Sequence, residues 1–237
     1  MMEELKSLAD LLDLQSVDLE IDRLLHERES LPELDSYKAT HDELAKASSR
    51  LEKAQESLRE TNLAVDKTNG ELEIAEEKIS REQMRLYAGG LSARDADYMR
   101  REVEMLTRKK GEMEEEVLEL LERSEEQEAE VESAAAEVAS LTEKKNELEA
   151  AIAESWKGID ARLATKEERK AVIVPLIEED LVVLYEDLRK AKGGVGVGRL
   201  ADGTCGGCHL RITEAEELEV RRSDPPRCIH CRRILVV

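Results

Sequence analysis

The stretch Leu86-Tyr87-Ala88-Gly89-Gly90-Leu91-Ser92 separates two long segments that share a helical periodicity. Before it, apolar residues recur at every seventh position: Leu44, Leu51, Leu58, Val65, Leu72, Ile79 and Leu86. After it, apolar residues alternate at spacings of three and four from Val103 to Ile152. This spacing is typical of a coiled-coil seam. Two seams of similar length that meet at a pair of glycines predict an antiparallel helical hairpin with its tip near residues 87–92.

The composition favours long solvated helices over one large globule. The chain has 237 residues, of which 39% are charged and only 2% aromatic, and its formal net charge is -20. Few large apolar side chains are available for a compact core, whereas a single apolar stripe suffices for a coiled coil. No apolar run reaches the roughly 18 residues of a membrane helix, and no signal peptide is evident. We therefore expect a cytoplasmic protein without membrane contact.

The seam also predicts how the two helices pair. Small residues follow the large ones at the second seam position, which lets the helices approach closely. One register matches Leu58 with Leu120 and Val65 with Met113. Ser92 is expected to cap the return helix, and Asp95 to complete a capping box. The polar residues that interrupt the second seam are expected to fix the register rather than to bind a ligand: Lys110, Ser124, Gln127 and Lys145.

The segments outside the seam are expected to form the base of the hairpin. Pro32 should kink or break the first helical segment, or stand in a plain loop. Residues 150–175 should return beside residues 1–31, with Trp156 packed between them. Thr165-Lys166-Glu167-Glu168 resembles a capping box that opens a further helix, which Pro175 should bend. The predicted domains are a helical hairpin over 1–192, whose base is formed by 1–31 and 150–192, a glycine-rich linker over 193–203 and a C-terminal module over 204–237.

The cysteines point to a metal site in the C-terminal module. Cys205, Cys208, Cys228 and Cys231 form two C-x-x-C pairs separated by nineteen residues, a spacing typical of structural zinc sites. Four thiolates would fill a tetrahedral shell around one structural Zn²⁺ ion and leave no position for a reacting water. His209 and His230 are alternative ligands, and a redox dithiol pair is a further alternative. Residues 210–213 and 233–237 have the pattern of short strands, and Thr213 to Glu216 that of a helix start.

The sequence resembles a known bacterial family. The approach LYEDLRKAKGGVGVGRLADGTCGGCHLRI (residues 184–212) and the close RCIHCRRIL (residues 227–235) are similar to the C4-type zinc-ribbon family with an N-terminal coiled-coil hairpin. The resemblance implies a mainly α fold with a small C-terminal β zinc ribbon, and zinc ligation by the four cysteines. It also implies a non-enzymatic adaptor or chaperone, or a nucleic-acid-binding protein. The family usually has glycine after the last cysteine, where this chain has Arg232, so we expect a less regular second knuckle.

An adaptor that binds protein partners is the preferred hypothesis. The long rod displays surface, and the tip carries Tyr87, Leu91, Tyr98 and Met99 where helical packing can no longer cover all of them. Such a set is a candidate docking site, unless these side chains pack on one another inside the turn. No nucleophile and base pair, acidic cluster or open metal site is visible. We therefore expect neither an enzyme nor a small-molecule substrate.

Nucleic-acid binding is the alternative hypothesis, and charge limits it to the C-terminal region. Residues 193–237 hold seven Lys/Arg against six Asp/Glu, a balance of +1. Because the whole chain has a net charge of -20, residues 1–192 carry a net charge of -21. The hairpin should therefore repel a phosphate backbone. The candidate contacts are the arginines of the C-terminal module: Arg211, Arg221, Arg222, Arg227, Arg232 and Arg233. Against this, the module lacks aromatic residues that would stack on bases.

Overall fold

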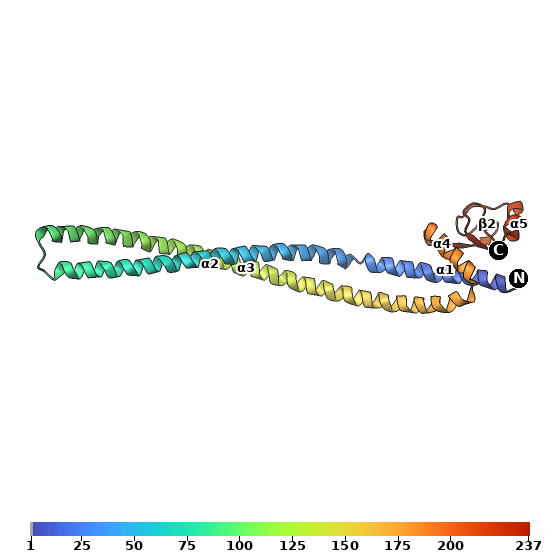
Figure 1. Cartoon of the computed structure of the whole chain (residues 1–237), viewed down its shortest axis with the longest axis horizontal. Helices are drawn as coiled ribbons and strands as arrows, with labels where there is room; N and C mark the ends of the chain where they lie inside the picture. Colours follow the sequence, from blue (N-terminus) through green and yellow to red (C-terminus); the bar gives the residue numbers. More distant parts are fainter. Residues whose placement is uncertain (1) are drawn as a thin grey trace. The chain divides into compact units, whose positions relative to one another are not determined.

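The computed structural model describes residues 2–237, with side chains from residue 8 onward. Its elements, in chain order, are α1 (Met2–Glu29), α2 (Pro32–Tyr87), α3 (Ala93–Ile173), the 3-10 turn η1 (Val174–Leu176), α4 (Glu179–Ala191), β1 (Val197–Ala201), β2 (Thr204–Cys205), α5 (Glu214–Arg222) and β3 (Ile234–Val236). They confirm the predicted class, a long helical hairpin with a small C-terminal β region (Figure 1). The chain divides into a hairpin unit, residues 36–147, and a terminal unit, residues up to 35 together with 148–237.

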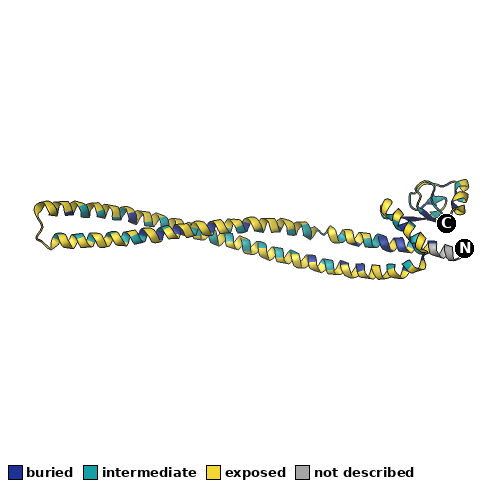
Figure 2. Ribbon diagram, viewed as in Figure 1, coloured by how far each residue is buried: buried dark blue, intermediate teal, exposed yellow. Residues whose placement is uncertain are grey.

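Most of the buried seam residues of α2 in the hairpin unit are small. The buried positions of α2 are Thr40, Ala47, Ala54, Thr61, Val65 and Thr68. The leucines of the neighbouring seam position, such as Leu44 and Leu58, stay partly exposed. Small side chains therefore lie where the two helix backbones come closest, and large ones flank them. The buried residues follow one stripe along each helix, and the outer faces are solvated (Figure 2).

The turn at the tip is made by the two glycines. Gly89 and Gly90 have φ values of 79° and 86°, a left-handed conformation that other residues adopt only with strain. The Oγ of Ser92 accepts a hydrogen bond from the amide of Asp95 at 3.2 Å, which confirms the predicted cap of α3. The Asp95 carboxylate accepts a bond from the same hydroxyl at 2.6 Å. Asp95 thus supports the cap through the hydroxyl of Ser92.

The two helices pair in a register shifted from the predicted one. Gln127 donates to Ser57 Oγ at 2.7 Å, and Ser124 donates to Asn62 at 2.7 Å. The predicted register would instead have placed Leu58 opposite Leu120. The observed partners on α3 lie about one heptad further along the helix. A heptad pattern repeats every seven residues, so it leaves registers that differ by one heptad equally allowed.

The four polar seam residues of α3 all contact α2. Ser124 and Gln127 make the hydrogen bonds just described, Lys110 pairs with Glu76 at 2.8 Å, and Lys145 lies over the ring of Tyr37 at 5.6 Å. Hydrogen bonding to Glu76 is the largest of the effects that raise the pKa of Lys110. Each contact is satisfied in one alignment only, which supports their predicted role in fixing the register.

The terminal unit has a core built around α1. Leu11, Leu14 and Tyr185 are completely buried, and residues of α3, α4 and the sheet pack around them. The members of this core are Leu8, Leu11, Leu14, Val17, Ile173, Ile177, Tyr185, Leu188, Val197 and Ile234. The break predicted at Pro32 is confirmed, because α1 ends at Glu29 and Pro32 is the first residue of α2. Outside this core, the indole of Trp156 on α3 donates to the Arg28 carbonyl at 3.2 Å, so Trp156 contacts the end of α1.

Two predictions about the end of the long helix are wrong. Thr165 does not open a new helix, since α3 continues through it to Ile173 and its hydroxyl donates to the Ala161 carbonyl at 3.1 Å. No helix-breaking residue precedes it, and a threonine inside a helix can bond backwards in this way. Pro175 does not bend a helix but lies in the turn η1, where α3 has already ended. Its missing amide and fixed φ explain the stop.

The glycine-rich segment is not the linker predicted over 193–203. Residues 197–201 form β1, the central strand of a sheet ordered β2-β1-β3, antiparallel to β2 and parallel to β3. The Gln15 carboxamide on α1 accepts from the amides of Gly196 and Val197 at 2.8 Å and donates to the Val197 carbonyl at 2.9 Å. A Cβ at Gly198 would lie 2.7 Å from the Gly207 amide, so glycine is needed for close packing.

The C-terminal strands and helix agree only in part with the predictions. β3 (Ile234–Val236) and α5, capped by Thr213 and Glu216 in a reciprocal capping box, are confirmed. Residues 210–213 do not form a strand and contribute only an isolated bridge between Thr204 and Arg211. The chain leaves the sheet there because Thr213 already serves as the cap of α5.

A buried carboxylate joins three helices of the terminal unit. Asp18 on α1 is 1% exposed, and it accepts hydrogen bonds from the Lys170 ammonium on α3 and the Tyr185 hydroxyl on α4, each at 2.8 Å. Burial and the bond to Asp18 raise the pKa of Tyr185. For Lys170, burial opposes the charge, but the contacts with Asp18 and Glu186 outweigh it and raise the pKa. Each carboxylate oxygen of Asp18 therefore accepts a hydrogen bond, one from Lys170 and the other from Tyr185.

Candidate metal centre and tip surface

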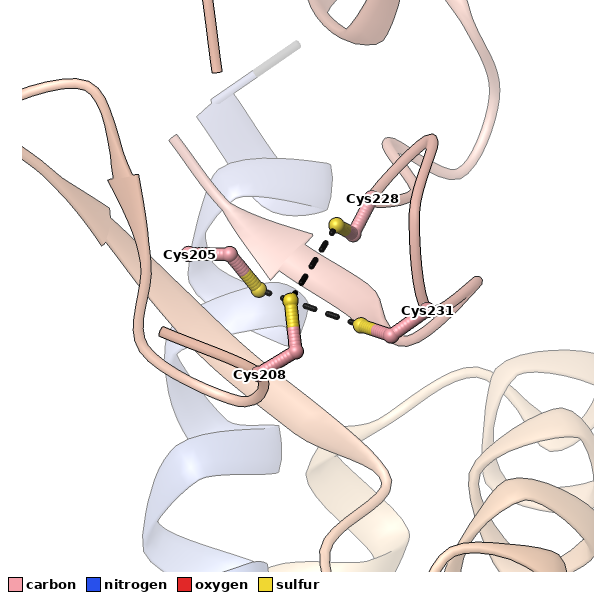
Figure 3. A group of neighbouring side chains, drawn as sticks. All are labelled: Cys205, Cys208, Cys228 and Cys231. Carbon is pink, nitrogen blue, oxygen red and sulfur yellow. Dashed lines mark hydrogen bonds between the residues drawn. The ribbon is translucent and has the colours of Figure 1, made fainter. Parts of the chain in front are cut away.

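The four cysteines meet at one point in the C-terminal region. Cys205 is the last residue of β2 and Cys208 lies in the turn after it, and Cys228 and Cys231 come from the turn before β3. Their sulfurs point toward one another (Figure 3). All four Sγ atoms lie within 4.8 Å of one another, and the Cys205–Cys231 and Cys208–Cys228 pairs are each 3.9 Å apart. These separations are far longer than a disulfide bond, so the thiols are free. The cluster could hold a metal ion.

The two cysteine turns are built in the same way. In the first, the His209 amide donates to the Cys205 carbonyl at 2.8 Å; in the second, the Arg232 amide donates to the Cys228 carbonyl at 2.8 Å. His209 and Arg232 have φ values of 58° and 65°. The second knuckle is therefore as regular as the first, contrary to the expectation based on Arg232. The arginine instead adopts the left-handed conformation for which glycine is better suited.

The histidines beside the cysteines do not join the cluster. The ring of His230 lies 3.2 Å from the Arg211 carbonyl, and His209 is exposed.

Burial raises the pKa of Cys205 to about 12 and also raises the pKa of Cys228. Burial acts in the same direction on Cys231, but hydrogen bonds from Arg233 lower its pKa to about 7. A bound cation would supply the positive charge that four clustered thiolates need.

Replacing Arg232 with glycine should stabilise the second knuckle by about 1 kcal/mol, because it removes the left-handed strain. The expected result is an approximately fivefold slower native-state exchange of the Cys228 amide, which bonds to the Arg233 carbonyl at 2.8 Å within this turn. His209→Gly is the matched control and should slow exchange of the Cys205 amide instead. Unchanged or faster exchange in the Arg232→Gly protein would contradict the strain argument.

Half of the six candidate nucleic-acid arginines are engaged within the protein. Arg233 donates to the carbonyls of Val195 and Lys192 at 2.7 and 3.0 Å, which ties the last knuckle to the end of α4. Arg227 donates to the Arg232 carbonyl at 3.1 Å. Arg221 pairs with Glu217 at 2.6 Å. The other three are exposed: Arg211 lies in the loop before α5, Arg222 at the end of α5 and Arg232 on the second knuckle.

The predicted tip set divides into exposed and buried members. Tyr87 is 85% exposed, Tyr98 72% and Leu91 37%, whereas Met99 is only 9% exposed. Met99 is therefore removed from the set, because it lies at a seam position between the helices, seven residues before Leu106. Sequence reasoning missed Ile74 and Met105, which are also exposed on the hairpin. The signal was available, since both are large apolar residues outside the seam positions.

The chain is similar in sequence to known proteins. The profile of the CT398-like coiled coil hairpin domain matches residues 14–193. The chain belongs to this family. An uncharacterized protein of Mycobacterium tuberculosis is 28% identical over 229 residues, covering 95% of this chain and 93% of that protein.

Solved structures agree with the fold. A Mycobacterium smegmatis protein superposes with a TM-score of 0.82 at 26% identity, covering 98% of this chain and 97% of the other. CT398 from Chlamydia trachomatis superposes with a TM-score of 0.75 at 17% identity, covering 97% and 96% of the two chains. Within the described residues, no helix has an apolar stretch long enough to cross a membrane.

Proposed function

We propose that this protein is a non-enzymatic adaptor or chaperone that binds protein partners through the tip of its hairpin. The observation that supports the proposal most directly is the exposure of Tyr87 and Tyr98 beside the turn, 85% and 72% respectively. The chain has only 2% aromatic residues, and two of its four tyrosines lie solvated at the tip. Tyrosine is enriched at the energetic centres of protein interfaces, where it supplies a large contact area at low entropic cost.

The proposal includes one structural Zn²⁺ ion held by Cys205, Cys208, Cys228 and Cys231. A tetrahedron with Zn–S bonds of about 2.3 Å has edges of about 3.8 Å. The observed 3.9 Å separations fit that edge length. Four thiolates complete the coordination shell, which supports a structural rather than a hydrolytic role. Free thiols arranged for a metal are typical of a reducing compartment, which supports a cytoplasmic location as part of the proposal.

The engaged arginines make nucleic-acid binding the less favoured alternative. Three of the six candidate side chains already hold protein groups, and the hairpin carries strong negative charge. Were RNA or DNA the ligand, retention at low salt would depend on Arg211, Arg222 and Arg232, and would fall steeply as salt increased. Complete loss of partners after nuclease treatment would favour this alternative.

The adaptor proposal predicts that Tyr87→Ala combined with Tyr98→Ala reduces partner recovery at least tenfold. Loss of two solvated aromatic anchors removes contact area without disturbing the seam, so the fold should remain intact. The measurement is affinity purification of the full chain from its native cell after nuclease treatment, with quantitative mass spectrometry. Leu63→Ala combined with Leu118→Ala is the control, since both leucines are exposed on the same unit but lie outside the tip. Equal recovery from the tip and control variants would exclude the tip as the docking site.

A further inference from the structure

One ion pair identifies which side of the hairpin the exposed residues near the tip share. Lys78 on α2 pairs with Glu102 on α3 at 3.1 Å. Ile74 and Arg81 lie four residues before and three residues after Lys78, and Tyr98 and Met105 stand in the same relation to Glu102. Residues three or four apart lie on one face of a helix. Ile74, Arg81, Tyr98 and Met105 therefore lie on the same side of the hairpin, and we refer to them as the tip-side patch.

The tip-side patch exposes large apolar side chains that the seam does not use. Ile74 is 70% exposed and Met105 60%, and Tyr98 is the exposed tyrosine already described. In the observed register, in which Asn62 pairs with Ser124 and Glu76 with Lys110, Met105 is level with Arg81 and Tyr98 with the end of α2, and Ile74 lies about one heptad further from the turn. On α2 the exposed Met84 and Tyr87 continue from Arg81 toward the turn. Exposed apolar side chains grouped in this way mark an interaction surface more often than isolated ones do.

The charge at the turn end of the patch is opposite in sign to that of the rest of the protein, although the balance over the whole span 74–105 is -1. Residues 80–101 contain five arginines and three acidic residues, a balance of +2. Because the whole chain has a net charge of -20, the remainder of the chain carries a net charge of -22. Arg85 pairs with Glu82 at 3.1 Å, and Arg101 with Asp97 at 2.9 Å. Across the described chain, no carboxylate forms an ion pair with the three other arginines of this segment: Arg81, Arg94 and Arg100. The tip therefore offers unpaired positive charge beside apolar side chains.

The shape of the patch fits a helix better than an extended segment. Two antiparallel helices present side chains from both sides of a shallow groove, which a third helix can enter with apolar residues at positions i, i+3 and i+7. The span from Ile74 to Tyr87 corresponds to about 20 Å, or roughly four helical turns. We propose that the tip-side patch binds an acidic amphipathic helix of a partner protein, with apolar anchors on Ile74, Tyr98 and Met105 and carboxylates beside Arg81 and Arg94. This inference rests on the proposed adaptor function and specifies the partner.

The test compares two synthetic helical peptides of about 18 residues with identical leucine positions. One carries glutamate and the other lysine on its polar face, and binding to the full chain is followed by fluorescence anisotropy. The quantity compared is the difference in peptide affinity between the wild-type protein and the Ile74→Ser, Met105→Ser double variant. This difference reports on the patch alone, because the double variant leaves binding elsewhere on the acidic chain unaffected. Leu118→Ser combined with Leu121→Ser is the matched control, since both leucines are exposed on α3 away from the patch. Arg81→Glu tests the charge alone.

The expected result is binding of the glutamate peptide that the patch variant weakens about tenfold and the control variant leaves unchanged. Arg81→Glu should weaken it as well, and raising the salt concentration should reduce the affinity, as for attraction between opposite charges. The inference is overturned if the patch-dependent binding is absent, is equal for both peptides or favours lysine. Patch-dependent binding of an oligouridine, or of a second copy of the chain in sedimentation experiments, would also overturn it.

The adaptor function and its refinement can fail separately. If the tyrosine variants lose their native partners but neither peptide binds to the patch, the adaptor function stands and the acidic-helix partner is wrong. If native partner recovery is unaffected by the tyrosine variants, the proposed function itself fails, whatever the peptides show.

Discussion

Replacing Cys205 or Cys228 with serine will abolish metal binding and unfold the C-terminal region around the two knuckles. Both side chains are completely buried, and they form the centre of a small cluster with Ile212, Val220 and Leu235. So few apolar residues cannot offset the entropy of ordering this segment without the metal. Binding of a structural zinc ion contributes on the order of 10 kcal/mol to such folds. Metal analysis of the purified protein should give about one equivalent of zinc for the wild type and almost none for either variant.

The histidines provide the control for this prediction. His209→Ser and His230→Ser should keep the full zinc content, since neither ring belongs to the sulfur cluster. Hydrogen exchange should show that α5 and the knuckles lose protection in the cysteine variants while the hairpin unit keeps it, because the seam of α2 and α3 contains no metal ligand. A cysteine variant that retains a full equivalent of zinc, or wild-type protein with less than about half an equivalent, would refute a structural zinc site.

The hairpin and the cysteine cluster were accessible from sequence because each depends on regular spacing. A heptad ladder that stops at Gly89 and Gly90 specifies two helices and a turn, and paired C-x-x-C motifs specify two facing knuckles. The register was not accessible, because a ladder constrains it only to within whole heptads. The side chains that choose among the allowed registers, such as Ser124 with Asn62, do so through specific hydrogen bonds across the helices.

The glycine-rich segment was predicted to be a linker because its glycine content was given more weight than a local turn signal. Asp202-Gly203 joins β1 to β2, with both residues at positive φ, and an Asp-Gly pair between short apolar segments is a strong hairpin signal. What the sequence could not reveal is the support from α1, where Gln15 takes over backbone hydrogen bonds of a strand nearly two hundred residues away. Long-range polar contacts of this kind follow from tertiary packing and have no periodic signature.

The predictions for Met99 at the tip and for Pro175 failed for similar reasons. Met99 and Tyr98 are neighbours in sequence, yet one is buried and the other exposed, because a helix turns by about 100° between adjacent residues. Grouping them by sequence proximity therefore overlooked the seam position of Met99. At Pro175, the sequence indicated a disturbance of the helix but did not distinguish a bend from an end. The packing of Ile173 and Ile177 into the core of the terminal unit determines that outcome.

Replacing Asp18 with alanine will destabilise the terminal unit by about 3–5 kcal/mol, the cost of leaving partners of a buried charge uncompensated. The Lys170 ammonium would lose its 2.8 Å bond to this carboxylate, and the buried Tyr185 hydroxyl would lose its hydrogen-bond acceptor. The network joins α1, α3 and α4, so its loss should loosen all three helices together. Urea unfolding followed by the fluorescence of Trp156, the only tryptophan, reports on this unit because its indole contacts α1.

Asp22→Ala is the matched control for Asp18→Ala, because Asp22 also lies on α1 and also pairs with a cation of α4. Its bond to Arg189 is short, at 2.6 Å, but its side chain is 46% exposed. Solvent can replace that contact, so we expect a loss below about 1 kcal/mol. Tyr185→Phe should fall between the two, at about 1.5–3 kcal/mol, since it removes one hydrogen bond to the charged oxygen and leaves Lys170 in place. Equal destabilisation by the Asp18 and Asp22 variants would show that burial does not make Asp18 the more important carboxylate. It would also remove Asp18 as the residue that holds the three helices together.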